Sequence, residues 1–302
     1  MNPRRPYVEV AAALTARGSP GARVAGCRHG RGIIAEHIAP VRGYPAHLME
    51  ETMTQIPDSE PFSAEGGSTG VLVCHGFSGS PKSMKPWAKH LAEAGYTVEL
   101  PRLPGHGTTW QDMNRTRWED WYGEVDRVLT ELEERCEQVF VVGLSMGGTL
   151  SLRLAEEHPE LAGVVVVNPA VHTERPDRFV LPVIRHVVPA FPGISNDIKK
   201  PGVDEGAYTK LPLQAAYSLT RLWAKVKSDI SAIKQPILVF RSAEDHVVEP
   251  SNAQWVVDHV ASDDVTFIEL ENSYHVATLD YDAQIIFDES VDFIERILAE
   301  QG

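Results

Sequence analysis

From about residue 62 onward, two hydrophobic patterns alternate along the chain. Short runs of mostly apolar residues, typical of strands buried on both faces, fall at residues 70–74, 96–100, 139–142, 163–167, 236–241 and 265–270. Stretches in which apolar residues recur every three or four positions predict helices at residues 83–94, 118–135, 146–158, 250–260 and 283–300. This alternation predicts an α/β fold with a mainly parallel, doubly wound sheet. Right-handed crossovers then bring the carboxyl end of every parallel strand to one edge of the sheet.

Two parts of the chain depart from this alternation. Residues 172–222 contain six prolines and only short amphipathic pieces, so we expect a small cap inserted over the sheet edge. Residues 1–51 carry seven arginines against four acidic residues and have no sustained helical or strand period. We therefore expect residues 1–52 to be a disordered or dispensable extension, and residues 53–302 to form one α/β domain.

Composition and charge narrow the class of protein. The chain has 302 residues, of which 43% are hydrophobic, and its formal net charge is -14. An acidic surface argues against nucleic acid or an anionic membrane as the principal partner. No apolar run approaches the ~20 residues that span a bilayer, so we expect no transmembrane segment. The cysteines, Cys27, Cys74 and Cys136, lack metal-ligand spacing and indicate a reducing compartment rather than a disulfide framework.

The first residues bear on export. Arg4 and Arg5 precede an apolar stretch at residues 8–14, as in a twin-arginine signal. Glu9 interrupts that stretch, however, and no clear cleavage site follows. We therefore expect a cytoplasmic protein.

The candidate chemistry centres on a G-x-S-x-G motif between a predicted strand and a predicted helix. The motif comprises Gly143, Leu144, Ser145, Met146 and Gly147. A serine lifted onto so tight a turn can be reached by a base, and the N-terminus of the following helix faces it. The alternative is an ordinary strand-to-helix turn, because short glycine-and-serine patterns also occur by chance. The flanking strand and helix favour Ser145 as a catalytic nucleophile.

Two candidate partners for this serine follow later strands. Asp245 comes after the strand at 236–241 and His275 after the strand at 265–270, so both should lie at the edge that carries Ser145. The chain order Ser, Asp, His is the order of the α/β-hydrolase arrangement. In that arrangement the histidine takes the serine proton and the aspartate orients the imidazole.

Rival side chains lie near these candidates in the sequence. Glu244 could replace Asp245, which could itself be a turn or helix-cap carboxylate. His246 or His259 could replace His275, although His259 lies inside a predicted helix and away from the sheet edge. Position relative to the strands favours Asp245 and His275.

An acyl-transfer site also needs hydrogen-bond donors for the oxyanion. A nucleophile elbow supplies the N–H of the residue after the serine, here Met146, and the second donor usually comes from the loop after the first central strand. That loop is residues 75–79, and we assign its Phe77 N–H as the second donor. His75 is expected to order the loop through hydrogen bonds.

Five ordered motifs extend from residue 75 to residue 282. They read HGFSGSPKSM (75–84), PRLPGHGT (101–108), GLSMGGTLSL (143–152), EDHVV (244–248) and NSYHVATLDYD (272–282). Together they resemble the bacterial monoacylglycerol lipase and carboxylesterase group of α/β-hydrolases, over about residue 60 to the C-terminus. The resemblance implies an α/β-hydrolase fold, with Ser145, Asp245 and His275 as the triad and Phe77 and Met146 as the oxyanion donors. Residues 1–52 and 175–191 depart from the family's pattern, which leaves the substrate more open than the chemistry.

The resemblance also implies a small cap with an acyl channel and an alcohol pocket. By its place in the cap, Glu205 resembles the acidic residue that meets glycerol in monoacylglycerol lipases; the alternative is a solvated carboxylate beside Asp204. Apolar cap residues suited to lining the channel are Val180, Leu181, Val183, Ile184, Val187 and Ile194. Each of these could instead simply pack the cap onto the body.

These observations predict a serine ester hydrolase that cleaves monoacylglycerols, or similar small-molecule esters, through an acyl-enzyme and without a cofactor or metal. Within the same chemistry, the alternative is a broad short-chain carboxylesterase or a feruloyl-type esterase. A perhydrolase with the same triad and a non-catalytic binding protein on this scaffold are further alternatives. An epoxide hydrolase or haloalkane dehalogenase would carry Asp at position 145, where this chain has serine.

Overall fold

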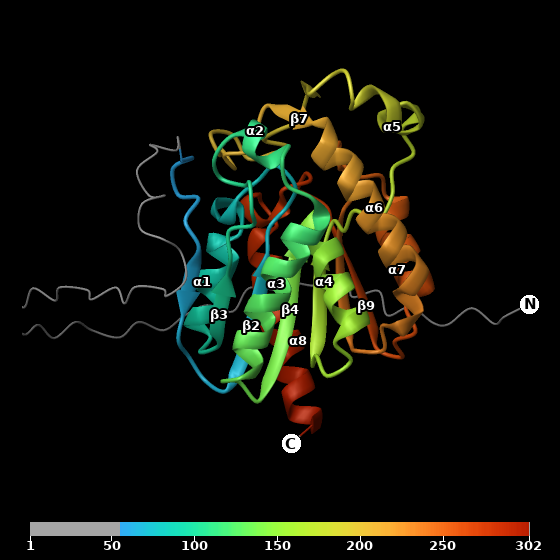
Figure 1. The fold of residues 1–302 in the computed structure, drawn as a ribbon. Coiled ribbons are helices and arrows are strands. Elements are labelled where there is room, and N and C mark those ends of the chain that lie inside the picture. Colours follow the sequence, from blue (N-terminus) through green and yellow to red (C-terminus); the bar gives the residue numbers. More distant parts are fainter. Residues whose placement is uncertain (1–54, 302) are drawn as a thin grey trace, which may run out of the picture. The chain divides into compact units, whose positions relative to one another are not determined.

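The computed structural model describes residues 55–301, so the predicted extension at residues 1–52 lies outside it. Seven strands form one sheet in the order β1-β3-β2-β4-β5-β8-β9 (Figure 1). They are β1 (Phe62–Ala64), β2 (Thr69–Cys74), β3 (Thr97–Leu100), β4 (Gln138–Leu144), β5 (Gly163–Val167), β8 (Ile237–Ser242) and β9 (Val265–Leu270). Neighbouring strands are parallel except β1, a short edge strand that runs antiparallel to β3. The predicted mainly parallel sheet is confirmed, whereas β1 lacks the buried apolar run that predicts the other strands.

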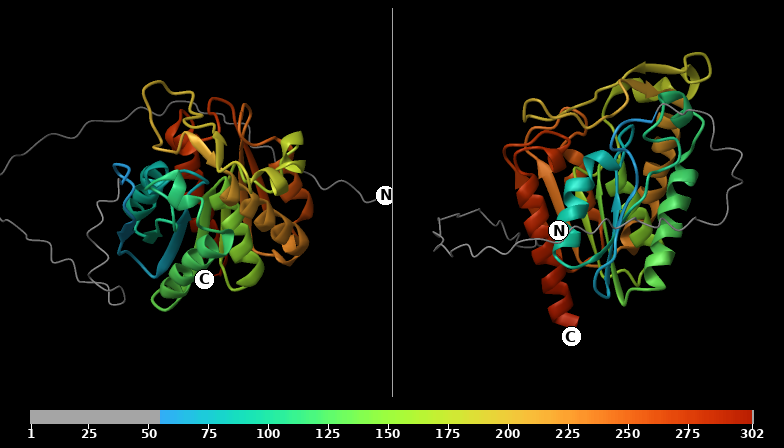
Figure 2. Two further views of the ribbon diagram at one scale, coloured as in Figure 1. Left: turned by 45° about the horizontal axis from the view of Figure 1, so that its top comes forward. Right: turned by 90° about the vertical axis from the view of Figure 1, so that its left-hand side faces the viewer.

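Helices cover both faces of the sheet. One face packs against α1 (Lys85–Glu93) and α8 (Ala283–Gln301), and the other against α3 (Trp118–Glu133), α4 (Met146–Glu157), α6 (Leu213–Asp229) and α7 (Ser251–His259). The right-hand view of Figure 2 shows α8 and α3 on opposite sides of the strands. Side chains of a strand alternate between the two faces, so Val141 of β4 packs in the cluster with α3 and α4, and Val142 in the cluster with α1 and α8. A core on both faces explains why the central strands are wholly apolar.

The register of the central strands brings their carboxyl ends together. Cys74 at the end of β2 pairs with Gly143 of β4. Leu144 at the end of β4 pairs with Val167 at the end of β5. The loops after β2, β4 and β5 therefore leave the sheet side by side, and those after β8 and β9 follow at the same edge.

Residues 172–212, which we call the cap segment, cross from the end of β5 to α6 above this edge (Figure 1). The segment contains a 3₁₀ helix (Pro176–Phe179), α5 (Leu181–Ile184) and two antiparallel strands, β6 (Ala190–Pro192) and β7 (Lys210–Pro212). A further short helix, α2 (Trp110–Met113), lies beside β7. Prolines begin or end several of these pieces, which explains why no long element forms there.

Helix α6 differs from the sequence prediction. The sequence pattern predicts only short amphipathic pieces up to residue 222, but α6 is a single helix of 17 residues. Its buried side includes Ala215, Leu219, Leu222 and Val226, which pack in the same core cluster as α3 and α4. The helical spacing of these residues was the available signal, and the prolines just before it obscured the start of the helix. The predicted end of the cap, at about residue 222, therefore falls inside α6, which is a helix of the α/β body.

The structure also bears on two predictions from composition, the absence of a transmembrane segment and the state of the cysteines. Within residues 55–301, no helix combines the length and apolar character needed to cross a membrane. Cys74 and Cys136 are free thiols, and Cys27 lies outside the described residues. Burial raises the pKa of the Cys74 thiol to about 12, which makes it an unreactive core residue.

Candidate active site

Ser145 occupies the turn between β4 and α4. Its backbone has a φ of 56° and a ψ of −117°, a strained conformation for a residue with a side chain. Two glycines permit the turn, because a Cβ on Gly147 would collide with the carbonyl oxygen of Cys74, and a Cβ on Gly143 with the carbonyl group of Gly147. The Ser145 N–H donates to the carbonyl oxygen of Val167 at 2.9 Å. The elbow is thus fixed to its neighbouring strands, with the serine side chain at the sheet edge.

Asp245 and His275 form a hydrogen-bonded pair at the same edge. The distance between His275 Nδ1 and Asp245 Oδ2 is 2.8 Å. The other carboxylate oxygen, Oδ1, accepts the main-chain N–H groups of Val247 and Val248, each at 2.8 Å. Burial disfavours ionisation of Asp245, but the charge and hydrogen bond of His275 and the two amides outweigh burial and lower the pKa of the carboxyl. The carboxylate is therefore both ionised and oriented.

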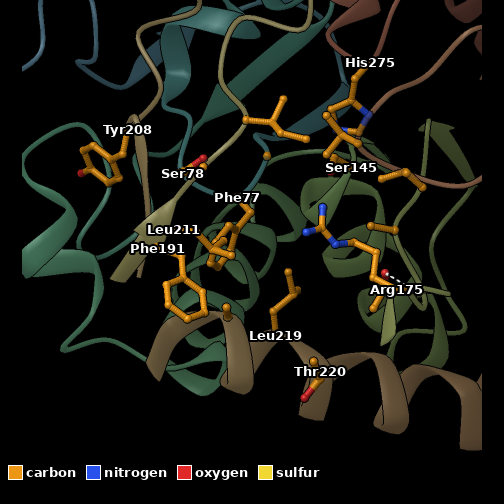
Figure 3. Close-up of a pocket in the computed structure, with 18 of the residues that line it drawn as sticks. Phe77, Ser78, Ser145, Arg175, Phe191, Tyr208, Leu211, Leu219, Thr220 and His275 are labelled. Atoms are coloured by element: carbon orange, nitrogen blue, oxygen red, sulfur yellow. Dashed lines mark hydrogen bonds between the residues drawn. The ribbon is translucent and has the colours of Figure 1, made fainter. Parts of the chain in front are cut away.

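The ring of His275 lies beside Ser145 in a buried position (Figure 3). Burial disfavours the imidazolium, but Asp245 outweighs this effect, with further contributions from Glu205 and Asp197, and the pKa of His275 is raised. An imidazole in this setting can take up a proton and keep it through a reaction step.

The rival acid and imidazoles have other partners. The Glu244 side chain is half exposed, and its Oε1 lies 3.5 Å from Nε2 of His246. The Nδ1 of His246 pairs with Asp197 at 2.8 Å. His259 lies in α7, and its Nδ1–H donates to a carbonyl oxygen of the same helix at 2.7 Å. Of these candidates, only Asp245 makes the side-chain bond to His275 among the contacts of the described residues.

The loop after β2 lies against the elbow. A Cβ on Gly76 would be 3.6 Å from the Cβ of Ser145. His75 orders this loop, because its Nδ1–H donates to the Gly76 carbonyl at 3.0 Å and its Nε2 accepts the N–H of Leu103 at 3.2 Å. Burial lowers the pKa of His75 to about 4, so the ring is neutral near pH 7. Its role here is to support the loop.

Of the two residues predicted to supply oxyanion donors, Met146 directly follows the serine and Phe77 lines the same cavity. Met146 is the first residue of α4, where an N–H has no acceptor within its own helix. Phe77 lines the same cavity as Ser145, and its ring packs edge-on against Trp121 with centroids 5.8 Å apart. The helix N-terminus adds partial positive charge at this point, which favours a developing anion.

A cavity of about 270 Å³ opens beside Ser145 and His275 (Figure 3). Apolar side chains of its wall come from the body and α6 (Phe77, Leu144, Leu219, Trp223) and from the cap segment (Val180, Leu181, Ile184, Phe191, Ile194). Four of the predicted channel residues are therefore in the wall. The prediction is wrong for Val183 and Val187, which are 73% and 76% exposed, because Val183 lies on the outer side of α5 and Val187 in the exposed turn after it, whereas Ile184 faces the cavity.

Glu205 is buried in the cavity wall, so the alternative of a solvated carboxylate does not hold. Its Oε1 accepts the main-chain N–H of Asn196 at 2.7 Å, and its own N–H donates to Asn196 Oδ1 at 2.9 Å. Its Oε2 lies 4.0 Å from the point that a Cβ on Gly79 would occupy, near the loop after β2. Burial raises the pKa of Glu205. The neighbouring Asp204 is the exposed carboxylate of the pair.

Two residues that the sequence analysis does not single out also reach the site. Asn168 follows β5 with a φ of 45°, and its Nδ2 donates to the carbonyl oxygen of His275 at 2.8 Å. Asp197 accepts the main-chain N–H of His275 at 3.1 Å. The position of Asn168 directly after a buried strand could have indicated a residue of the site. The position of Asp197 gives no such indication, because it lies in the irregular cap segment, 78 residues before His275.

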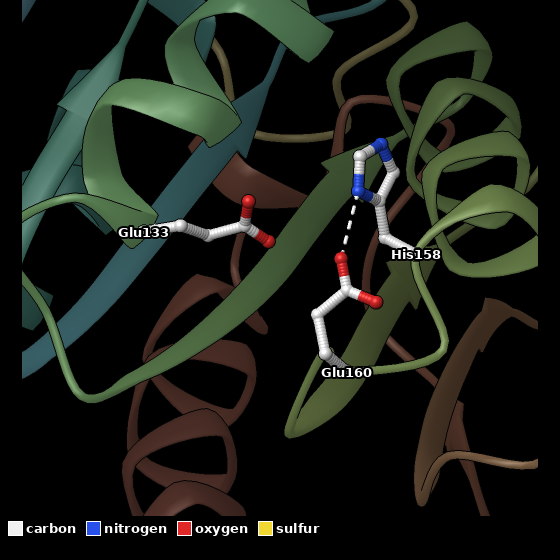
Figure 4. Close-up of side chains that lie close together, drawn as sticks. All are labelled: Glu133, His158 and Glu160. Atoms are coloured by element: carbon white, nitrogen blue, oxygen red, sulfur yellow. Dashed lines mark hydrogen bonds and ion pairs between the residues drawn. The ribbon is translucent and has the colours of Figure 1, made fainter.

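A cluster away from this edge has side-chain types that can bind metals. Glu133, His158 and Glu160 bring possible ligand atoms within 4.8 Å of one another (Figure 4). Both nitrogens of His158 are already engaged, Nδ1 with Glu160 at 3.0 Å and Nε2 with Asp126 at 2.8 Å. Burial opposes protonation of His158, but these two bonds outweigh it and raise its pKa. The arrangement favours an imidazolium ion pair, and we assign no metal to it.

Comparison with known proteins identifies the family. Residues 68–282 match the family described as serine aminopeptidase, S33. The chain is 44% identical over 255 residues to a thermostable monoacylglycerol lipase from Bacillus sp. (strain H-257), covering 82% of this chain and 99% of that one. It is 28% identical over 241 residues to a carboxylesterase from Bacillus subtilis (strain 168), covering 79% of this chain and 97% of that one.

Solved structures agree with this grouping. A metagenome-derived lipolytic enzyme matches with a TM-score of 0.78 at 42% identity, over 80% of this chain and 99% of that one. The monoacylglycerol lipase of Paleococcus ferrophilus shares the fold, with a TM-score of 0.68 at 20% identity over 78% of this chain and 98% of that one. The chain is therefore an α/β-hydrolase. It belongs to the serine aminopeptidase S33 family and, within it, to the serine ester hydrolases, so the predicted fold and family are confirmed.

Proposed function

We propose that the protein hydrolyses monoacylglycerols to fatty acid and glycerol, with Ser145, His275 and Asp245 as its catalytic triad. The observation that carries the proposal is the 2.8 Å bond between His275 Nδ1 and Asp245 Oδ2 beside the strained Ser145 elbow. Such a bond holds the imidazole in the tautomer whose Nε2 can accept a proton. The 44% identity to a monoacylglycerol lipase, over nearly all of that relative, supports the substrate class.

The first half-reaction forms an acyl-enzyme. His275 Nε2 removes the proton from Ser145 Oγ while that oxygen attacks the ester carbonyl carbon. The negative charge that passes to the carbonyl oxygen is stabilised by the N–H groups of Phe77 and Met146. The bond from the acyl carbon to the glycerol oxygen then breaks, and His275 gives its proton to that oxygen. The products are acyl-Ser145 and free glycerol.

The second half-reaction releases the fatty acid. A water molecule gives a proton to His275 as its oxygen attacks the acyl carbon, and the same two N–H groups stabilise the oxyanion. The bond to Ser145 Oγ breaks, and the proton on His275 returns to that oxygen. Asp245 stabilises the imidazolium in both halves and stays ionised throughout.

The cavity wall fits the two ends of such a substrate. Apolar residues, Ile194 among them, line the part that would take the acyl chain. Glu205 offers carboxylate oxygens to the free hydroxyls of glycerol. A buried hydroxyl without a partner costs about 1 to 3 kcal/mol, so an acceptor here discriminates glycerol esters from other esters.

Hydrolysis rates on three esters of different size test this proposal. We expect hydrolysis of 1-monooleoylglycerol with a higher kcat/KM than p-nitrophenyl acetate. We expect little hydrolysis of triolein, which has three acyl chains and no free glycerol hydroxyl for Glu205. A preference for short p-nitrophenyl esters with no activity on 1-monooleoylglycerol would instead favour a broad carboxylesterase, the activity named for the 28% identical relative.

We also infer that residues 53–302 are the working unit, with a cap inserted after β5 that ends where α6 begins, and that the protein acts in the cytoplasm. The free thiols of Cys74 and Cys136 support a reducing compartment. A chain shortened to begin at Met53 should keep its activity and melting temperature. A fall in melting temperature of more than a few degrees would contradict the proposed unit.

A further inference from the structure

The cap segment carries a carboxylate that contacts the loops of both the proposed base and the proposed acid. Asp197 Oδ2 accepts the main-chain N–H of His275 at 3.1 Å and that of His246 at 3.2 Å. Its main-chain carbonyl accepts the N–H of Val276 at 3.1 Å. Its Oδ1 lies 2.8 Å from Nδ1 of the His246 ring. One cap residue thus holds two consecutive amides of the histidine loop and the residue that follows Asp245.

Asp280 makes the reciprocal connection from the histidine loop to the cap segment. This buried carboxylate accepts the main-chain N–H of Lys199 at 2.6 Å and that of Lys200 at 2.9 Å. It also accepts the N–H of Tyr274 at 2.9 Å, next to the proposed base. Residues 197–200 and the loop that carries the histidine are therefore bonded to each other in both directions.

The residue before Asp197 links the same stretch of the cap to the glycerol end of the cavity. Asn196 has a φ of 57° and exchanges two hydrogen bonds with Glu205. A stretch of two residues therefore contacts both the proposed base and the proposed glycerol-binding carboxylate. A shift of residues 196–197 relative to the body would therefore move both the main chain of His275 and the carboxylate of Glu205.

We propose that Asp197 is a positioning residue for the ester hydrolysis: it holds the main chain of His275 and of the residue after Asp245, so that the triad is aligned when the cap segment is seated. This inference rests on the proposed triad. Both carboxylate oxygens are used, and three of the four bonds described above are to main-chain N–H groups. Alanine in this place removes both carboxylate oxygens, whereas an amide could keep both main-chain bonds through one oxygen and turn its NH₂ group toward His246 Nδ1, so alanine is the informative substitution.

The first test compares Asp197→Ala with Glu244→Ala. Glu244 is an exposed acid near the same His246 ring but is not bonded to the histidine loop, so it is a matched control. The substrate is p-nitrophenyl butyrate, which needs neither the long acyl channel nor the glycerol pocket. We expect kcat to fall by about tenfold to a hundredfold in Asp197→Ala, as small misplacements of reacting groups do, with KM little changed. Glu244→Ala should behave like the unaltered protein.

The pH profile, together with a ratio of rates on two substrates, separates positioning of the triad from a general loosening of the cap. The charged groups that face this arrangement are Asp245, Glu205 and Asp197 around His275, and Asp197, Glu244 and Asp245 around His246. Lys199 is paired with Glu244. Removing the negative charge of Asp197 removes one of the groups that raise the pKa of His275. The acid limb of kcat/KM should therefore shift to lower pH in Asp197→Ala.

Glu205 also raises the pKa of His275, so a loosened cap that moves Glu205 would shift the limb as well. A loosened cap would, however, also lower the ratio of kcat/KM for 1-monooleoylglycerol to that for p-nitrophenyl butyrate, whereas loss of the Asp197 bonds alone should leave this ratio unchanged.

Two further variants guard against a folding artefact, with all rates measured where circular dichroism shows a folded chain. Asp197→Glu restores two oxygens and the charge, and should return the acid limb toward its original pH. His246→Gln keeps the main-chain bonds of Asp197, and should cost less than about threefold. An unchanged kcat and unchanged acid limb in Asp197→Ala would overturn the inference, as would a full loss in His246→Gln. Organophosphate labelling of Ser145 in the unaltered protein tests the triad separately, so failure of one proposal is distinguishable from failure of the other.

Discussion

The body around Ser145 and the cap segment use apolar residues in opposite ways. In the body, Val141, Val142 and their neighbours on β4 are fully buried between two layers of helices. In the cap segment, Phe179 and Val183 are 72% and 73% exposed. The cap segment is joined to the catalytic loops mainly by hydrogen bonds to carboxylates, whereas the elbow is fixed by close packing of backbone.

This difference assigns separate tasks to the two regions. A nucleophile on a packed elbow is in the same position for every ester. A wall held by hydrogen bonds can vary in shape without disturbing the sheet, so it is suited to selecting among esters. We therefore expect changes in the body, and at Asp197 where the cap segment holds the triad loops, to affect all substrates equally. Changes elsewhere in the cavity wall of the cap should separate one substrate from another.

The largest expected effect is in the body. Asp245→Asn should lower kcat for every ester by roughly 10⁴, because the amide favours the wrong tautomer of His275. The measurement is kcat for p-nitrophenyl butyrate and for 1-monooleoylglycerol. Glu244→Gln is the neighbouring control and should retain full activity. If the Glu244 variant is the inactive one, the acid has been misassigned.

The second-largest effect should be a loss of activity on monoacylglycerols but not on other esters. Glu205→Gln and Glu205→Ala should lower kcat/KM for a monoacylglycerol by about tenfold or more, because a partner of the glycerol hydroxyls is lost or weakened. The p-nitrophenyl ester of the same acyl chain has no glycerol and should be spared. Equal losses on both substrates would mean general damage to the cap, since Glu205 also holds Asn196. No loss on either would favour the broad carboxylesterase.

The pH dependence should again be common to all substrates, because it arises in the body. His275 must be neutral to accept the serine proton, and its pKa is raised above the ordinary value of 6.5. Activity should therefore fall as pH decreases through this raised pKa, by about tenfold for each unit below it. The measurement is kcat/KM against pH for both esters. A midpoint below 6.5, or different midpoints for the two esters, would contradict this account.

The smallest effect should appear at the cap wall. Ile194→Ala removes part of the cavity lining and should lower the preference for long over short acyl chains by about threefold to tenfold, since the side chain is half exposed and only partly enclosed. Val183→Ala is the matched control, because Val183 is a cap residue outside the wall. Kinetics on p-nitrophenyl butyrate and laurate measure the ratio. Equal changes in the two variants would show that the wall residues do not select chain length.

The triad residues could be predicted from the sequence because each of them follows the end of a strand. Ser145, Asp245 and His275 each follow a buried apolar run, and parallel strands share one carboxyl edge, so sequence position alone indicates that they meet. The strands at Gly163–Val167 and Val265–Leu270 have the bounds that the pattern predicts.

The unpredicted part depends on contacts made across the chain. The cap has no regular period, so the pattern could not separate Ile184 in the wall from Val183 in solvent. Asp197 acts on the main chain of His275 from 78 residues away, which leaves no mark in local spacing, whereas the position of Asn168 directly after β5 was a signal that the sequence analysis did not use. Helix α6 was recognisable in principle, but its start directly after Pro212 resembled the end of the proline-rich cap.

Covalent labelling of the nucleophile tests the central claim most directly. The unaltered protein and Ser145→Ala are incubated with an organophosphate, and the adduct is located by mass spectrometry of the digested chain. We predict one adduct, on Ser145, with loss of esterase activity in proportion to labelling, and no adduct in a folded Ser145→Ala protein, which should lack nearly all activity. Undiminished labelling or activity in Ser145→Ala would contradict the assignment of the nucleophile, and with it the proposed mechanism.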